Sequence, residues 1–181
     1  MSIPKGALKD SKVSWDCLGP ISGGGTVVGL AISPVREVLG YWVAPTPHIP
    51  LYWAATSCGI FRSYTSGKRW TQYLTGLTTP LLSSLTVAIN GALFAGALDG
   101  SLCYSMDFGK SWSAGKVPRE LRAPVTATLA SPSFRKDNAA FAATSGTGVL
   151  VTRDGGKSWE DSSVGLADST VLALAASPDW S

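Results

Sequence analysis

Short apolar runs alternate along this chain with polar segments, and each run is bounded by glycine, proline or a Ser-Pro pair. The runs are rich in Ala, Val, Leu and Thr, and no apolar period of 3.6 residues persists between the glycines, so the pattern favours strands over helices. It predicts an all-β chain of short strands joined by tight turns. The predicted strands are residues 26–33, 51–56, 84–89, 93–97, 125–130, 140–144 and 171–176.

Three polar segments share one template and end in tryptophan: Ser63–Trp70, Ser105–Trp112 and Thr152–Trp159, called here the box segments. Their tryptophans lie 42 and 47 residues apart, the length of a four-stranded propeller blade. Each unit reads as inner strand, loop (often Ser-Pro), second strand, glycine turn, third strand, box segment and outer strand. The predicted blades are residues 26–75, which include an inserted loop at 35–50, then 82–116 and 125–163.

Both ends of the chain match parts of further units. Residues 1–25 contain Ser14 and Trp15, where the outer strand of a preceding blade is predicted to begin. Residues 170–181 match the inner strand of a following blade. Propellers usually close with about four to eight blades. Three whole blades therefore predict either a fragment of a larger propeller or a ring completed by several copies of the chain.

The box segments contain residue types that fold a hairpin turn. Asp107 and Asp154 are expected to accept hydrogen bonds from backbone N–H groups, a glycine two residues later to supply a positive φ, and the tryptophan to pack between sheets. Thr65 replaces the aspartate in the first copy, so that hairpin is expected to be the least stable. The predicted structural positions are Ser63, Thr65, Gly67, Trp70, Ser105, Asp107, Gly109, Trp112, Thr152, Asp154, Gly156 and Trp159.

This template resembles the Asp-box, Ser-x-Asp-x-Gly-x-Thr-Trp, of BNR repeats. The chain is similar to bacterial YVTN/BNR-like repeat proteins, and it also resembles sialidases, xyloglucan-type endoglucanases, sortilin-type receptors and photosystem II assembly factors. The resemblance implies a β-propeller in which the binding or catalytic face lies at the end opposite the box segments. Several functions share such a blade, because function resides in the loops.

Strand direction alternates within a blade, so the glycine turns and the connections between blades should lie together at the end opposite the box segments. The glycine turns contribute Ser57, Cys58, Asp99, Ser145 and Thr147, and the connections contribute Arg119, Glu120, Arg122, Asp161 and Asp168. Two of these candidates have a simpler interpretation. Glu120 between two arginines also fits a solvated ion-pair cluster, and Asp99 before glycine also fits a turn.

The inserted loop at 35–50 is a candidate partner-binding loop, because aromatic residues dominate interface hot spots. It contains Tyr41, Trp42 and His48, the single histidine of the chain. A tolerated surface insertion explains the same residues. One histidine without companions builds neither a metal site nor a nucleophilic triad.

Composition narrows the function classes. The chain of 181 residues has 45% hydrophobic and 15% charged residues and a net charge of +3, with its basic residues scattered, so we expect no nucleic-acid partner. Residues 1–10 lack the apolar core of a secretory signal, and no apolar run is long enough to span a membrane. Cys17, Cys58 and Cys103 fit neither a disulfide framework nor a metal site. We expect no metal and no cofactor, and the compartment stays open.

Three functions remain. A non-catalytic binding module, with a protein or carbohydrate ligand, follows from the lack of clustered acids once the box aspartates are assigned to turns. A fragment of a glycoside hydrolase, sialidase-like or xyloglucanase-like, would need opposed carboxylates, and Asp99 has no evident partner. A photosystem II assembly factor-like or sortilin-like propeller is the third. Self-association that completes a ring is compatible with each.

Overall fold

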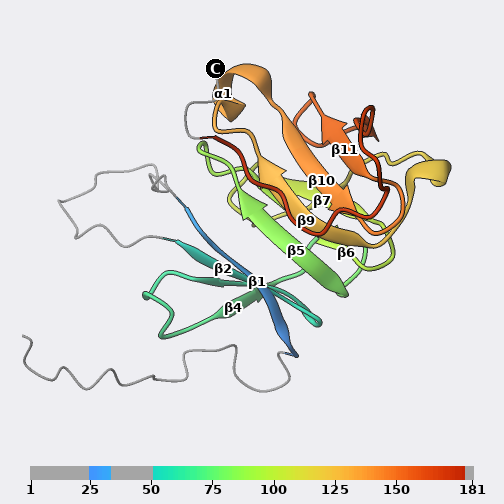
Figure 1. The fold of residues 1–181 in the computed structure, drawn as a ribbon. Helices are drawn as coiled ribbons and strands as arrows, with labels where there is room; N and C mark the ends of the chain where they lie inside the picture. Colours follow the sequence, from blue (N-terminus) through green and yellow to red (C-terminus); the bar gives the residue numbers. More distant parts are fainter. Residues whose placement is uncertain (1–24, 34–50, 178–181) are drawn as a thin grey trace, which may run out of the picture.

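The computed structural model describes residues 25–33 and 51–177. This part is nearly all β and forms three antiparallel four-stranded sheets, each built from strands that are consecutive in sequence (Figure 1). The predicted all-β fold is therefore confirmed. The predictions for residues 1–24 and for Tyr41, Trp42 and His48 in the inserted loop lie outside the described residues.

Every sheet runs in chain order from inner to outer strand. The first sheet contains β1 (Val27–Ile32), β2 (Tyr52–Thr56), β3 (Gly59–Ser63) and β4 (Thr71–Tyr73). The second contains β5 (Leu82–Val87), β6 (Leu93–Ala97), β7 (Leu102–Ser105) and β8 (Ser113–Ala114). The third contains β9 (Val125–Ala130), β10 (Ala140–Thr144), β11 (Val149–Thr152) and β12 (Glu160–Asp161). Two short helices, η1 (Arg119–Leu121) and α1 (Phe134–Asp137), lie in connections.

The predicted inner strand at residues 171–176 forms no ladder with any strand of the described part. Thr170 makes an isolated bridge with Ser145, and the Val171 N–H donates to the Thr144 carbonyl. Beyond Val171 the chain runs without regular secondary structure to residue 177. A strand is defined by its hydrogen-bonded neighbour, and no described segment takes that place here.

The three sheets stack face to face around two apolar clusters, with β1, β5 and β9 as successive inner strands (Figure 1). Alternation along β6 supplies both clusters: Leu93 and Ala95 face the first sheet, whereas Phe94 faces the third. The sheets approach closely where side chains are small. A Cβ on Gly96 would lie 2.3 Å from Cγ1 of Val125, so only glycine fits there.

Helix α1 was not predicted and occupies the loop that follows Ser131-Pro132. The Phe134 ring is buried and meets the Phe94 ring edge to face at 5.4 Å between centroids. Asn138 then ends the helix in the left-handed region with φ +50°. No helix of the described residues is long and apolar enough to cross a membrane.

Candidate functional site

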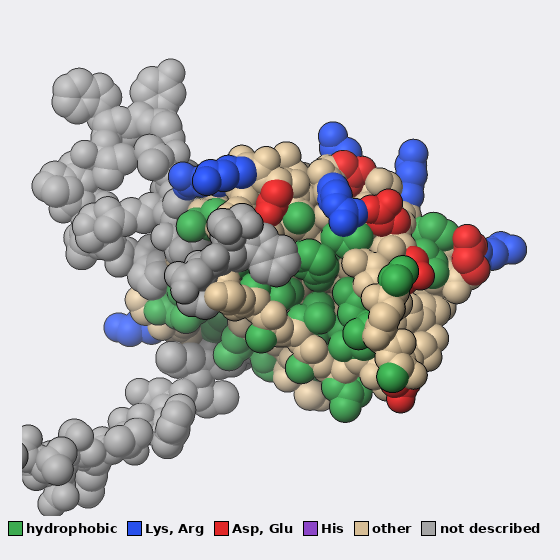
Figure 2. All heavy atoms as spheres, turned by 45° about the horizontal axis from the view of Figure 1, so that its top comes forward, with side chains coloured by type: hydrophobic (Ala, Val, Ile, Leu, Met, Phe, Trp, Pro, Cys, Tyr) green, Lys and Arg blue, Asp and Glu red, His purple; other side chains and the backbone are tan. Residues whose placement is uncertain are grey.

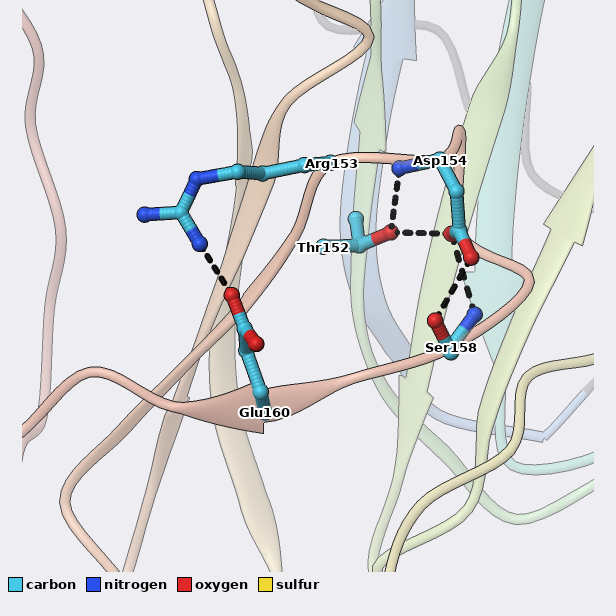
Figure 3. A network of polar contacts seen from close by, with 5 residues as sticks. All are labelled: Thr152, Arg153, Asp154, Ser158 and Glu160. Atoms are coloured by element: carbon cyan, nitrogen blue, oxygen red, sulfur yellow. Dashed lines mark hydrogen bonds and ion pairs between the residues drawn. The ribbon is translucent and has the colours of Figure 1, made fainter.

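The second and third box segments form the same hydrogen-bonded turn, of which Figure 3 shows the third. In the third, Asp154 Oδ1 accepts from the Ser158 N–H at 3.0 Å and Oδ2 accepts from the Ser158 hydroxyl at 2.6 Å. Thr152 Oγ1 donates to Asp154 Oδ1 at 2.8 Å and accepts from the Gly156 N–H at 2.9 Å. Ser105, Asp107, Gly109 and Ser111 repeat each contact within about 0.1 Å. Arg153 and Glu160 flank the third turn as an exposed ion pair.

The first box segment keeps three of these four contacts, one of them lengthened to 3.4 Å between Ser63 Oγ and Thr65 Oγ1. Thr65 Oγ1 accepts from the Arg69 N–H at 2.8 Å, and Ser63 Oγ accepts from the Gly67 N–H at 3.0 Å. Thr65 offers one oxygen where aspartate offers two, and Arg69 has no hydroxyl to donate. The structural difference agrees with the expectation that this hairpin is the least stable, which stays a prediction.

The turn contacts also set the acidity of the box aspartates. Burial raises the pKa of Asp154, but hydrogen bonds from the side chain and backbone of Ser158 and from Thr152 outweigh it and lower the pKa from 3.8 to about 2. The pKa of Asp107 is lowered by the corresponding bonds from Ser111 and Ser105, against the same opposing effect of burial. Both carboxylates are held in their charged form as acceptors, which is the opposite of what a general acid requires.

Replacing Asp154 with asparagine is expected to lower the urea midpoint at pH 7. A depressed carboxyl pKa contributes stability that is fully present above the unfolded-state pKa and is lost as pH falls through the folded-state pKa. The difference between wild type and Asp154→Asn should therefore shrink as pH falls from about 5 toward 2. A difference that stays constant between pH 7 and pH 2.5 would show that the carboxylate charge does not stabilise this turn.

The tryptophans of the second and third box segments hold neighbouring sheets together. Trp112 is buried in the cluster between the first and second sheets, and Trp159 in the cluster between the second and third. The Trp159 ring meets the Phe94 ring edge to face, with 6.4 Å between centroids. Trp70 is only half-buried. The box segments thus serve the fold, and a functional site has to be sought elsewhere.

The opposite end is formed by the glycine turns and the connections between sheets, and hydrogen bonds join them. Thr147 Oγ1 donates to the Leu121 carbonyl at 2.9 Å, which ties the β10–β11 turn to helix η1. The N–H groups of Gly146 and Gly148 both donate to the Ser169 carbonyl, in the connection after β12. The β10–β11 turn is therefore held from both sides. We call the end of the molecule formed by the glycine turns and the connections between sheets the glycine-turn end.

The box end is distinct from it. The Gly155 N–H donates to the Asn138 carbonyl at 3.1 Å, which places the third box turn beside the loop between β9 and β10. The two ends of the third sheet therefore carry different loops, as the alternation of strand direction requires. Helix α1, with Arg135 and Lys136 exposed, lies in that loop at the box end.

Three acids predicted for the binding face cap turns. Each accepts a hydrogen bond from the backbone N–H two residues later: Asp99 from Ser101 at 2.8 Å, Asp161 from Ser163 at 2.9 Å, and Asp168 from Thr170 at 2.8 Å. For Asp161 the bonds from Ser163 lower the carboxyl pKa. The turn interpretation given for Asp99 agrees with this contact, and the Asp-x-Ser/Thr spacing of an Asx turn would have predicted the same role for Asp161 and Asp168.

The charged side chains in and directly after η1 differ from these acids, because they do not cap turns. Arg119, Glu120 and Arg122 are all exposed, and no ion pair joins them to one another or to any other described residue. The solvated ion-pair cluster considered for Glu120 is thus not formed in the described part of the chain. The backbone beneath them is well fixed, because the Leu121 carbonyl is bonded to Thr147. The turn that contains Asp99 packs tightly against the backbone that follows η1, because a Cβ on Gly100 would lie 2.9 Å from the Ala123 nitrogen.

The other candidates at this end have local partners. The Cys58 N–H donates to Thr56 Oγ1, and the Thr56 hydroxyl donates to the Gly59 carbonyl, while Ser57 Oγ accepts from the Thr26 N–H. Thr144 closes its own turn in the same way, a role that the sequence analysis missed although Thr56 and Thr144 both end a second strand. Ser145 is exposed.

No cluster of metal ligands occurs in residues 25–33 and 51–177. Among these residues no three His, Cys, Asp or Glu side chains gather in a way that could hold a metal ion. Cys103 is buried, with its sulfur 3.1 Å from the Thr78 hydroxyl, and Cys58 is half-buried at the glycine-turn end. The chemistry on offer at the glycine-turn end is therefore hydrogen bonding and charge from exposed arginines.

No protein-family model matches the sequence, and no curated protein matches it. Solved structures do match. YCF48 bound to a D1 peptide has 16% sequence identity and a TM-score of 0.56, over 76% of this chain and 40% of that one. The fold is that of β-propeller blades. The GH74 xyloglucanase from Xanthomonas campestris has 14% identity and a TM-score of 0.53, over 78% of this chain and 24% of that one.

A computationally designed protein, Ika4, is also similar, with 11% identity and a TM-score of 0.55 over 86% of this chain and 82% of that one. At these identities the likeness is one of fold alone. The chain spans less than half the length of the YCF48 and GH74 chains that it matches. Blades of this kind therefore occur in proteins with different activities, and the loops have to decide the function.

Proposed function

We propose that the chain is a non-catalytic binding module of the BNR/Asp-box propeller type, whose glycine-turn end binds a protein segment. The observation that carries this proposal is the contrast at that end. The acids Asp99, Asp161 and Asp168 are used as turn caps, whereas Arg119 and Arg122 stand exposed on a fixed backbone without a described ion-pair partner.

Arginine fits such a role because it is enriched at protein interfaces and frequently forms hot spots. Its planar guanidinium donates up to five hydrogen bonds and can pair with a carboxylate or with backbone carbonyls. A fixed backbone lowers the entropy lost on binding. The structure of YCF48 with a D1 peptide supports peptide binding by a protein of this fold.

A glycoside hydrolase is the second candidate, favoured by the likeness to GH74 enzymes. Such chemistry uses two carboxyl groups facing each other across the scissile bond, about 5 to 9.5 Å apart. Asp99 is the candidate for one of them on position alone, since it is exposed at the glycine-turn end. Its Oδ1 already accepts a hydrogen bond from the Ser101 N–H, however, so the carboxylate is engaged in its own turn.

Selection of peptides from a random displayed library tests the proposal without a known partner. We expect selected peptides, and a labelled D1 peptide as a named probe, to bind wild type. Binding should weaken at least tenfold in Arg119→Glu/Arg122→Glu, since losing a hot spot costs about 2 kcal/mol or more. The measurement is fluorescence anisotropy.

A matched control makes the same change in net charge at the box end. Arg135→Glu/Lys136→Glu alters two exposed basic residues on α1, at the box end. This variant should bind like wild type. Equal loss in both double variants would show that net charge, and not the glycine-turn end, controls binding. Release of reducing sugar from xyloglucan that is abolished by Asp99→Asn would support the hydrolase instead.

A further inference from the structure

The C-terminal described segment, residues 171–177, has the sequence of a second β1. Val-Val-Gly-Leu-Ala-Ile-Ser-Pro at residues 27–34 and Val-Leu-Ala-Leu-Ala-Ala-Ser-Pro at residues 171–178 agree at Val, Leu, Ala, Ser and Pro. In this alignment Leu174 corresponds to Leu30 of β1. Both stretches are free of charged residues. The segment thus has the pattern of an inner strand.

Its position in the structure agrees with that correspondence. Ser83 Oγ of β5 donates to the Val125 carbonyl at the start of β9, at 2.6 Å. Thr126 Oγ1 of β9 donates in the same way to the Val171 carbonyl, at 2.5 Å. Val171 therefore stands next to β9 as Val125 stands next to β5. In Figure 1 the segment, in dark red, runs along β9.

Residues 171–176 nevertheless form no ladder with a strand of the described part of the chain. Leu172 is 74% exposed. Figure 2 shows apolar side chains gathered over the middle of the face that it displays, with charged side chains around the margin. An apolar, uncharged and unpaired strand edge is a template for pairing with another chain.

A strand with the pattern of β1 should pair with β2, because β2 is the strand that pairs with β1. Leu30 lies opposite Ala54 in that ladder, and Leu85 of β5 lies opposite Ala95 of β6 in the same register. Leu85 packs against the apolar cluster between the first and second sheets, whereas Leu30 is 69% exposed. β1 is held by its ladder with β2 and by packing against β5, where Gly29 lies close to Leu85. A strand of the same pattern can form the same contacts in its place.

We propose that residues 171–177 pair with β2 of a second copy of this chain, in the place that β1 holds. The first sheet of the second copy then follows the third sheet of the first copy as a further blade. The contact is heterologous, so that successive copies close a ring or extend as a filament.

A repeated aromatic contact supports this arrangement. The second residue of each second strand is Trp53, Phe94 or Phe141. Trp53 lies against the glycine of the next box segment, where a Cβ on Gly109 would come within 2.8 Å of Nε1. Phe94 lies in the same way against the glycine of the third box segment. Phe141 is only half-buried, and pairing of the copies would place the first box segment of the second copy against it.

Disulfide trapping between two variants tests the proposal. In a background with Cys17, Cys58 and Cys103 replaced by alanine, one chain receives Leu174→Cys and the other Ala54→Cys, because directly opposed residues in a ladder are close enough for a disulfide. After oxidation we expect a mixed dimer several-fold more abundant than with Lys110→Cys as the exposed control partner. A yield equal to that of the control would overturn the proposal.

Light scattering after size exclusion gives a second, independent readout on the 181-residue chain. Wild type should contain species of twice the monomer mass or more, and the share of these species should rise with concentration. Ala173→Pro removes an N–H from the exchanging segment and should leave the monomer, whereas Ala167→Pro in the exposed loop should behave like wild type. A wild-type chain that is monomeric at every concentration would contradict the proposal, while leaving peptide binding at the glycine-turn end untouched.

Discussion

Replacing Trp53 with alanine is expected to lower the free energy of unfolding by about 3 to 5 kcal/mol. The Trp53 side chain is fully buried in the cluster between the first and second sheets. It fills the space beside Gly109, which has no side chain and a φ of +75°. Truncation to alanine removes this contact and leaves a cavity between two sheets that relax only partly. Urea unfolding followed by tryptophan fluorescence and circular dichroism measures the loss.

Trp70→Ala is the matched control for that experiment. Trp70 is half-buried and belongs to neither apolar cluster. Its removal should cost about 1 kcal/mol, the usual effect of a substitution outside a core. Equal losses at Trp53 and Trp70 would mean that the first two sheets are not held together by packing around Trp53.

Replacing Arg62 with alanine is expected to cost about 2 to 4 kcal/mol, from a charged hydrogen bond and stacking on aromatic rings. Arg62 of β3 is fully buried, and its Nη1 donates to the Phe108 carbonyl in the second box segment at 2.6 Å. Its guanidinium lies 4.2 Å from the centre of the Tyr64 ring and 5.4 Å from that of Tyr73. Alanine would leave a carbonyl without its donor at the contact between two sheets.

Arg69→Ala provides the comparison, because Arg69 is exposed and the turn uses its backbone. Its unfolding free energy should change by no more than about 0.5 kcal/mol. Urea midpoints of Arg62→Ala, Arg69→Ala and wild type, measured at one pH, decide the point. An Arg62→Ala protein as stable as wild type would show that the arginine does not link the first two sheets.

Much of the fold could be predicted from the spacing of apolar runs and turn residues. The predicted strands at 93–97, 125–130 and 140–144 coincide with β6, β9 and β10. Each outer strand begins one residue after the tryptophan that was expected to start it. Helix α1 was missed because four residues carry no periodic signal, and the burial of Phe134 against Phe94 becomes visible only in three dimensions.

Less of the candidate site could be predicted, because charge in a sequence does not show what a side chain contacts. Asp99, Asp161 and Asp168 were assigned to the glycine-turn end from strand direction, and the structure adds that each accepts a hydrogen bond within its own turn. Arg62 is fully buried and donates to the Phe108 carbonyl of the second sheet, a contact that nothing in its local sequence indicates. Such assignments depend on contacts between blades, for which local sequence offers no pattern.

Amide chemical shifts measured during titration with a selected peptide test the central claim most directly. If the glycine-turn end is the binding surface, the largest changes should fall on residues 119–123 and 145–148, which the Thr147–Leu121 hydrogen bond joins. The amides of α1 and of the box segments should move little. Changes concentrated on α1 and the box segments, with residues 119–123 unaffected, would contradict the account.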